Sequence, residues 1–287
     1  MTIAHDATTA LGSGTGTLSA THTPVGTPAG ATVLIVQNTG KTNEVTSVTY
    51  GGVAMTLAVF QANDTTEDGA VYIYHLGVGI PTGAQTVTVN VNVTASTKVA
   101  RVQTQTAAST TQVATTASSS GDLTDPSVTL VLESYRNSYA LGVLFSGHTD
   151  VASLTAATGF TDLAEHDFGS SSGAFIRADS EDAGGGQAVG WTATVEDSAI
   201  AAVAIEESTL LSGTFKISGV AQSGAKIDVN YAADTAKASY VFKEVVTTDG
   251  SGAWSAYIPA SAVGFANGSY TSGGTYYTAP SQVFLSV

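Results

Sequence analysis

Five consecutive glycines and serines give this chain a formal match to a nucleophile motif. Residues 169–173, GSSSG, fit the G-x-S-x-G pattern of the nucleophile elbow. In such an elbow the serine lies on a sharp turn between a strand and a helix, over an oxyanion hole. Here a strand-like segment follows, without helical periodicity. We therefore predict the tip of a β-hairpin, and we assign no catalytic residue.

Three histidines are the next candidates for acid–base or metal chemistry. His148 lies two residues before Asp150, and His166 lies between two acidic residues. A zinc site needs three or four converging ligands, and neither histidine has a second histidine at i+2 or i+4. We interpret both as histidines of surface loops. His75 continues an alternating strand, where we expect it to be half-buried and hydrogen-bonded.

Two acidic loops carry the oxygen ligands that calcium prefers. They are residues 63–68, NDTTED, and residues 179–182, DSED. Neither follows the ligand order of an EF-hand, so solvated turn charges are the favoured interpretation. The glycines of residues 184–186 indicate a hairpin turn and not a phosphate cradle. We predict no metal and no cofactor, with calcium at the acidic loops as the weaker alternative.

Aromatic residues gather near the C-terminus and are the candidate contact residues. Tyr270, Tyr276 and Tyr277 lie in a segment rich in tyrosine and glycine. Exposed tyrosines on a β-sandwich can stack on sugars or form a protein interface. In a small domain they can equally belong to the core and its rim. These three residues are therefore our candidates for an interface or a glycan contact.

The charge and composition of the chain exclude several classes of partner. Nine basic and 23 acidic residues give a formal net charge of −14, which repels nucleic acid and anionic membranes. The chain has no cysteine, so disulfides do not stabilise it. The first residues show no signal peptide, and no apolar run approaches the roughly 18 residues that span a bilayer. We expect synthesis in a host cytoplasm.

The elements that must position these residues are strands, and their pattern occurs twice. Four blocks recur in the same order: residues 32–40 and 139–147, the turns at Gly52 and Gly159, residues 69–74 and 173–178, and residues 87–93 and 189–195. Repeats of this length indicate a duplicated half-domain. We predict one pseudo-twofold sandwich over residues 29–207 whose two halves bury each other, with Val89 and Trp191 on equivalent strands.

The chain is therefore expected to be all-β, a jelly-roll-like sandwich of two pseudo-repeated halves followed by a small Ig-like sandwich. Residues 1–28 form a flexible N-terminal arm and the first strand, and residues 106–121 bridge the two halves. Residues 199–207, AIAAVAIEE, could form a short helix, but their place in the repeat favours a buried strand. The composition of the sequence changes near residue 207. We therefore expect residues 208–287 to form the second domain, with Trp254 in its core.

Four sequence segments resemble known modules: VTSVTYGGVAMTLA at residues 45–58, PTGAQTVTVNV at 81–91, SSSGDLTDPSVTL at 118–130 and GWTATVEDSAIAAVAIEE at 190–207. With these segments the chain resembles a β-sandwich module of phage virion proteins and bacterial surface proteins. VTTDGSGAWSAYIPA, at residues 246–260, is similar to Ig-like or carboxypeptidase-regulatory-like modules, in which the tryptophan fills the sandwich. Neither resemblance implies a catalytic residue.

The resemblance implies a structural protein of a virion and not an enzyme. The expected function is that of a bacteriophage capsid decoration or cement protein, which binds the assembled capsid and stabilises it. The expected partners are the major capsid protein or other virion proteins, with self-association, for instance as a trimer. The alternative is a carbohydrate-binding adhesin or tail-fibre module that recognises host glycans through tyrosine platforms.

Overall fold

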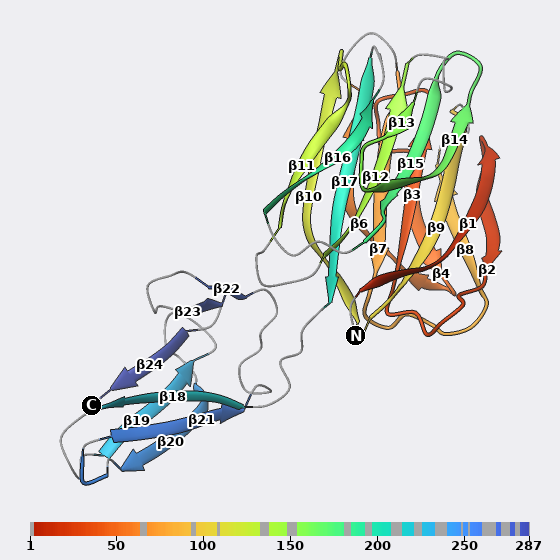
Figure 1. The fold of residues 1–287 in the computed structure, drawn as a ribbon. Helices are drawn as coiled ribbons and strands as arrows, with labels where there is room; N and C mark the ends of the chain where they lie inside the picture. Colours follow the sequence, from red (N-terminus) through yellow and green to blue (C-terminus); the bar gives the residue numbers. More distant parts are fainter. Residues whose placement is uncertain are drawn as a thin grey trace. The chain divides into compact units, whose positions relative to one another are not determined.

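Figure 1 shows the computed structural model of the chain, in which every described regular element is a strand. The chain divides into two units, Met1–Glu207 and Ser208–Val287. From residue 208 onward the structure describes mainly the backbone of the strands. The structure describes residues 3–63, 68–92, 96–107, 110–132, 138–147, 154–180, 185–192, 197–207, 214–220, 226–232, 240–247, 249–251, 253–259, 268–270, 276–278 and 282–286.

The first repeat is a sandwich of two antiparallel sheets. Its inner sheet has the order β1-β9-β3-β7-β6, and its outer sheet has the order β2-β8-β4-β5. The chain passes back and forth between the two sheets. This is compatible with the expected jelly roll, which stays a prediction at that level of detail. The strands are β1 (Ala4–Gly14), β2 (Leu18–His22), β3 (Gly30–Gln37), β4 (Val45–Tyr50), β5 (Val53–Ala54), β6 (Thr56–Ala62), β7 (Ala70–Leu76), β8 (Gln85–Val91) and β9 (Lys98–Thr106).

The second repeat has the same strand order. Its inner sheet is β10-β17-β12-β15-β14, and its outer sheet is β11-β16-β13. Val89 on β8 and Trp191 on β16 are both buried on equivalent strands, and Gly52 and Gly159 both have positive φ in turns. The predicted duplication is therefore confirmed. The strands are β10 (Thr111–Gly121), β11 (Ser127–Leu132), β12 (Ser138–Ser146), β13 (Thr155–Ala156), β14 (Phe160–Asp167), β15 (Ser172–Ala178), β16 (Gly185–Thr192) and β17 (Ser198–Glu207).

Two expectations about the repeat are wrong. Each repeat is a whole sandwich and not half of one, because residues 1–28, expected as a flexible arm and a first strand, form the two strands β1 and β2. The segment expected as a bridge, residues 106–121, contains β10. Strand β1 pairs with β9, and β10 pairs with β17 at the equivalent place. Both β1 and β10 are edge strands with a single neighbour, so their polar, small residues need no apolar period.

The two inner sheets pack face to face, so the unit has four layers. Across the interface β6 lies opposite β10, β7 opposite β17 and β3 opposite β12. The two sheets therefore run in opposite order, as a pseudo-twofold rotation requires. Inner strands such as β3, β7 and β12 are buried on both faces, whereas β11 in an outer layer alternates between exposed and buried residues. The predicted buried strand at residues 199–207 is confirmed as part of β17.

The inner sheets pack closely at Gly69, just before β7, and at Gly173, near the start of β15. A Cβ added to Gly69 would lie 2.3 Å from the ring of Phe145, and one added to Gly173 would lie 3.0 Å from Val36. Gly69 and Gly173 are the first residues of the blocks that the sequence repeats. These glycines are thus explained by the close packing of the two sheets.

The second unit consists of short antiparallel pairings. Its sheets are β18-β21, β20-β19-β24 and β22-β23. The Ig-like fold stays a prediction, and the side chain of Trp254 lies outside the described residues. The strands are β18 (Thr214–Val220), β19 (Lys226–Ala232), β20 (Tyr240–Thr247), β21 (Ala253–Pro259), β22 (Gly268–Tyr270), β23 (Tyr276–Thr278) and β24 (Gln282–Ser286).

Candidate functional site

The serine motif at residues 169–173 forms the turn between β14 and β15, as predicted. The amide of Phe168 donates to the carbonyl oxygen of Ser171 at 2.9 Å, which closes the hairpin. The carboxylate of Asp167 accepts a hydrogen bond from the amide of Gly169 at 2.6 Å. A strand follows the turn, so the backbone lacks the strand-to-helix geometry of a nucleophile elbow.

Of the three candidate histidines, the structure describes His75 on β7 and His166 on β14. His166 is on strand β14 and not in a loop, and its ring packs on Phe168 with centroids 4.6 Å apart. His148 and Asp150 lie outside the described residues. His75 is more deeply buried than the half-buried position expected, at 7% exposure. Its two ring nitrogens are hydrogen-bonded to the hydroxyls of Thr32 at 3.0 Å and Thr111 at 3.2 Å.

From the burial of His75 we expect the protein to lose stability in acid. Burial lowers the pKa of His75 from 6.5 to about 4, although a backbone hydrogen bond with Thr111 raises it in part. Between those values the unfolded chain binds more protons, so stability is present above pH 6.5 and falls as the pH drops towards 4. We expect His75 to account for a loss of about 1 kcal/mol over the first pH unit below its unfolded pKa.

Chemical denaturation at a series of pH values measures this loss. The His75→Gln variant serves as the control, because the other histidines remain and their contributions cancel in the difference. The stability difference between the two proteins should change with pH across this window. A difference that is independent of pH would contradict the prediction.

The acidic loops are only partly described. Residues 64–67 and 181–184 lie outside the described residues, and calcium binding there stays a prediction. Asp68 pairs with Lys41 at 3.5 Å on the surface. The described part of the chain holds no group of three or more His, Cys, Asp or Glu residues placed to bind a metal. It also holds no helix long and apolar enough to cross a membrane.

The candidate contact tyrosines lie on the paired strands β22 and β23. Tyr270 is directly opposite Tyr276 in the register, and Ser269 is opposite Tyr277. Their side chains lie outside the described residues, so their role in a contact stays a prediction.

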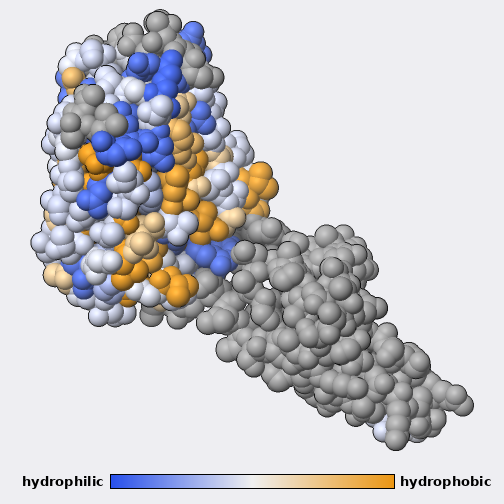
Figure 2. Space-filling model, turned by 180° about the vertical axis from the view of Figure 1, so that it is seen from behind, coloured by the Kyte–Doolittle hydropathy of each residue, from blue (hydrophilic) through white to orange (hydrophobic). Residues whose placement is uncertain are grey.

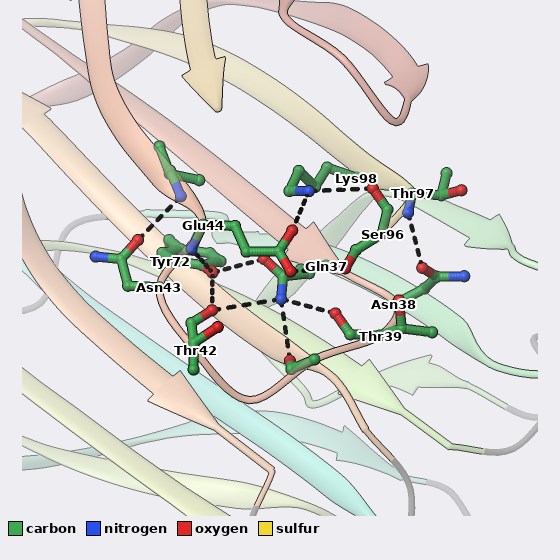
Figure 3. Close-up of polar contacts among 12 residues, drawn as sticks. Gln37, Asn38, Thr39, Thr42, Asn43, Glu44, Tyr72, Ser96, Thr97 and Lys98 are labelled. Atoms are coloured by element: carbon green, nitrogen blue, oxygen red, sulfur yellow. Dashed lines mark hydrogen bonds and ion pairs between the residues drawn. The ribbon is translucent and has the colours of Figure 1, made fainter. Parts of the chain in front are cut away.

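A buried polar cluster in the first repeat was not predicted from the sequence. The Lys98 ammonium donates to Glu44 Oε2 at 2.5 Å, and both side chains are almost completely buried (Figure 3). The other carboxylate oxygen, Glu44 Oε1, accepts from the hydroxyl of Ser96 at 2.9 Å. The Lys98 ammonium also donates to the carbonyl oxygen of Ser96 at 3.0 Å. The two charges therefore face each other inside the sandwich.

Gln37 and Tyr72 extend this cluster. The hydroxyl of Tyr72 donates to Gln37 Oε1 at 2.7 Å, and the amide of Glu44 donates to the same hydroxyl at 3.3 Å. Gln37 Nε2 donates to the carbonyl oxygens of Thr39 and Gly40 at 2.7 and 3.0 Å. Burial raises the pKa of Tyr72 to above its usual range, so the phenol stays protonated as a donor. The cluster holds the loop between β3 and β4 against the sheet.

The outward side of the sheet β2-β8-β4 is lined by hydroxyl and amide groups without a charge. On these strands the inward residues, such as Val87 and Val89, are buried, and the residues between them point outward. Ser19 and Thr88 are 3.3 Å apart at their hydroxyls, and Asn90 donates to Ser47 at 3.0 Å. We call this surface the hydroxyl face; it consists of Ser19, Thr21, Ser47, Thr49, Thr86, Thr88 and Asn90.

The surface of the first unit varies in hydropathy. Figure 2 shows the molecule from the side opposite to that of Figure 1, where pale residues lie beside a band of hydrophobic residues and several hydrophilic groups. Large hydrophobic residues are exposed at four described positions in this unit: Val25, Leu57, Val78 and Val131. The hydroxyl face itself offers hydroxyl and amide groups as its contact chemistry.

The fold and these sites define an all-β protein whose first unit is a tandem, four-layered sandwich. Comparison of the chain with protein-family models, with curated proteins and with solved structures finds no match. The surfaces and clusters of this chain are therefore the features that bear on its function.

Proposed function

We propose that the protein is a non-enzymatic structural protein of a virion, which decorates and stabilises an assembled bacteriophage capsid. The observation that carries this proposal is the hydroxyl face on β2, β8 and β4. A protein with a net charge of −14 is repelled by acidic partners. A face without charge reduces this repulsion where the protein contacts an acidic partner. Threonine, serine and asparagine side chains can then hydrogen-bond across the contact.

The build of the first unit supports the same proposal. Two sandwiches that share a buried interface form a stiff block, which can bridge neighbouring subunits without bending. The proposed partners are the major capsid protein or other virion proteins, and the protein itself is proposed to associate, for instance as a trimer. Many copies on one particle make weak individual contacts collectively strong.

Charged variants of the hydroxyl face test the proposal. In Thr88→Asp a carboxylate stands at the centre of the face, where it would be buried without a partner on docking. We expect binding to empty capsids of the encoding virus to weaken at least tenfold, which corresponds to about 1.4 kcal/mol. The matched control is Thr129→Asp on β11, an exposed threonine of the other outer sheet. Co-sedimentation with capsids measures both.

Equal binding by the two variants would remove the hydroxyl face from the contact. Failure of the unchanged protein to bind capsids would contradict the proposed function itself. Loss of the protein should make particles fragile and should leave adsorption to the host unchanged. The first two outcomes separate an error about the contact surface from an error about the partner.

One observation favours a second function, the recognition of host glycans. Tyr270 and Tyr276 are direct partners in the register between β22 and β23, so two aromatic residues are neighbours across this strand pair. Stacked rings on a sugar contribute on the order of 1 kcal/mol each. Glycan binding that is lost in Tyr276→Ala, together with no affinity for capsids, would favour this function over the first.

A further inference from the structure

We propose that Lys98 and Gln37 become joined by an isopeptide bond that the buried cluster forms by itself. The two residues are direct partners in the register between β9 and β3. Side chains of directly opposite residues start about 5 Å apart and lie on the same face of the sheet. Lys98 is fully buried and Gln37 is fully buried as well. A nucleophile and a carboxamide thus share one closed site. The proposal is independent of the capsid function.

The contacts of Gln37 favour it over the neighbouring asparagines as the acceptor. The Tyr72 hydroxyl donates to Gln37 Oε1 at 2.7 Å, so it polarises the carbonyl and can stabilise an oxyanion there. The carbonyl oxygens of Asn38 and Asn43 instead accept backbone amides, each at 3.0 Å, from Thr97 and Val45. These bonds fix the loop and leave Gln37 as the carboxamide beside the lysine.

Glu44 lies where a proton carrier is needed. Its Oε2 accepts from the Lys98 ammonium at 2.5 Å, and its Oε1 is held by Ser96 at 2.9 Å. Figure 3 shows the Glu44 carboxylate between Lys98 and Gln37. A carboxylate in this position can take a proton from the ammonium and return it to a leaving amine. Both side chains of the ion pair are almost completely buried, and burial strengthens charge interactions.

The reaction balances without any further reactant. Glu44 takes a proton from the Lys98 ammonium, and the free Nζ attacks Cδ of Gln37. The tetrahedral oxyanion on Oε1 is held by the Tyr72 hydroxyl. Glu44 then passes its proton to Nε2, the Cδ–Nε2 bond breaks, and the second proton of the attacking nitrogen follows. The products are a Lys98–Gln37 amide and one ammonium ion, and Glu44 is a carboxylate again.

The second repeat shows that the fold does not require this cluster. At the positions equivalent to Gln37, Tyr72 and Lys98, its paired strands carry Leu144, Ile176 and Ile200. Burying an ion pair costs desolvation, and replacing such a pair by packed aliphatic residues is often neutral or stabilising. The same fold therefore carries a buried polar cluster in the first repeat and packed aliphatic residues in the second. The polar cluster, which costs desolvation, contains every group that the reaction needs.

The intact mass of the full-length protein, measured after denaturation, tests the proposal. The expected mass is that of the sequence minus one ammonia, and digestion should give one branched peptide that contains both Lys98 and Gln37. The full calculated mass would overturn the proposal. A loss of water would also overturn it, since this would indicate a bond between Lys98 and Glu44.

Variants check the role of each group. Gln37→Leu and Lys98→Ile carry the residues of the second repeat, and their masses should equal the calculated ones. Glu44→Gln should leave the bond unformed, and Tyr72→Phe should slow its formation. If a single variant fails to fold, the double variant Gln37→Leu, Lys98→Ile restores a matched aliphatic pair. A branched peptide that persists in Glu44→Gln would overturn the role of Glu44.

Discussion

The Phe145→Ala variant is expected to lose about 3–5 kcal/mol of unfolding free energy in the first unit. Phe145 is completely buried in β12, where its ring contacts Gly69 of the other repeat. The truncation leaves a cavity between two inner sheets that are close-packed on both sides and cannot collapse into it easily. The loss should therefore fall near the upper part of the range for a buried phenylalanine.

Denaturant titration followed by tryptophan fluorescence measures this effect. The chain has two tryptophans, so a Trp254→Phe background leaves Trp191, which is buried in the first unit, as the reporter. Val131→Ala is the control, because Val131 is 74% exposed and its truncation should change stability by less than about 0.5 kcal/mol. Similar losses in the two variants would contradict the packing of the inner sheets around Phe145.

Gly69→Ala is expected to destabilise the same interface by about 1–3 kcal/mol. The added Cβ would lie 2.3 Å from the Phe145 ring, far inside van der Waals contact, so the ring or the sheet must shift. Gly16→Ala is the matched control, since an added Cβ there has no heavy atom within 4 Å. Equal stability of the two glycine variants would show that the inner sheets do not meet at Gly69.

A double-mutant cycle assigns this cost to one contact. In a Phe145→Leu background the ring is absent, so Gly69→Ala should cost less than it does in the unchanged protein. Residues in direct contact typically show coupling of about 0.5–3 kcal/mol. Additive effects would mean that Gly69→Ala acts through the backbone and not through Phe145.

The sequence predicted the strands that are buried on both faces. Strand β7, Ala70–Leu76, covers most of the repeated block predicted at residues 69–74, because a continuous apolar run between turn residues is what a doubly covered strand requires. The segment of β14 shows no such run, and the segments of β1 and β10 indicate an arm and a bridge from their sequence alone. All three are edge strands, whose half-exposed residues carry a weak apolar pattern. The number of sandwiches was therefore wrong, although the repeat itself was recognised.

The buried cluster could not be found by spacing. Glu44 and Lys98 are 54 positions apart, and the backbone register that sets Lys98 against Gln37 has no local signature. A lysine at the start of a strand is usually solvated, so its burial contradicts the ordinary expectation for this residue type. A comparison of the two repeats position by position would have given the signal, because aliphatic residues in one repeat align with polar ones in the other.

The four-layered arrangement affects how the chain folds during its translation. Each sandwich is continuous in sequence, so the first can fold before the second has been translated. Its inner sheet then presents a face of Leu34, Val36, Val71 and Ile73 whose cover has not yet been made. Exposed apolar sheets of this kind aggregate or recruit chaperones. The nascent chain is therefore most prone to aggregation after the first repeat has folded and before the second covers it. The speed at which the second repeat is translated sets how long this state lasts.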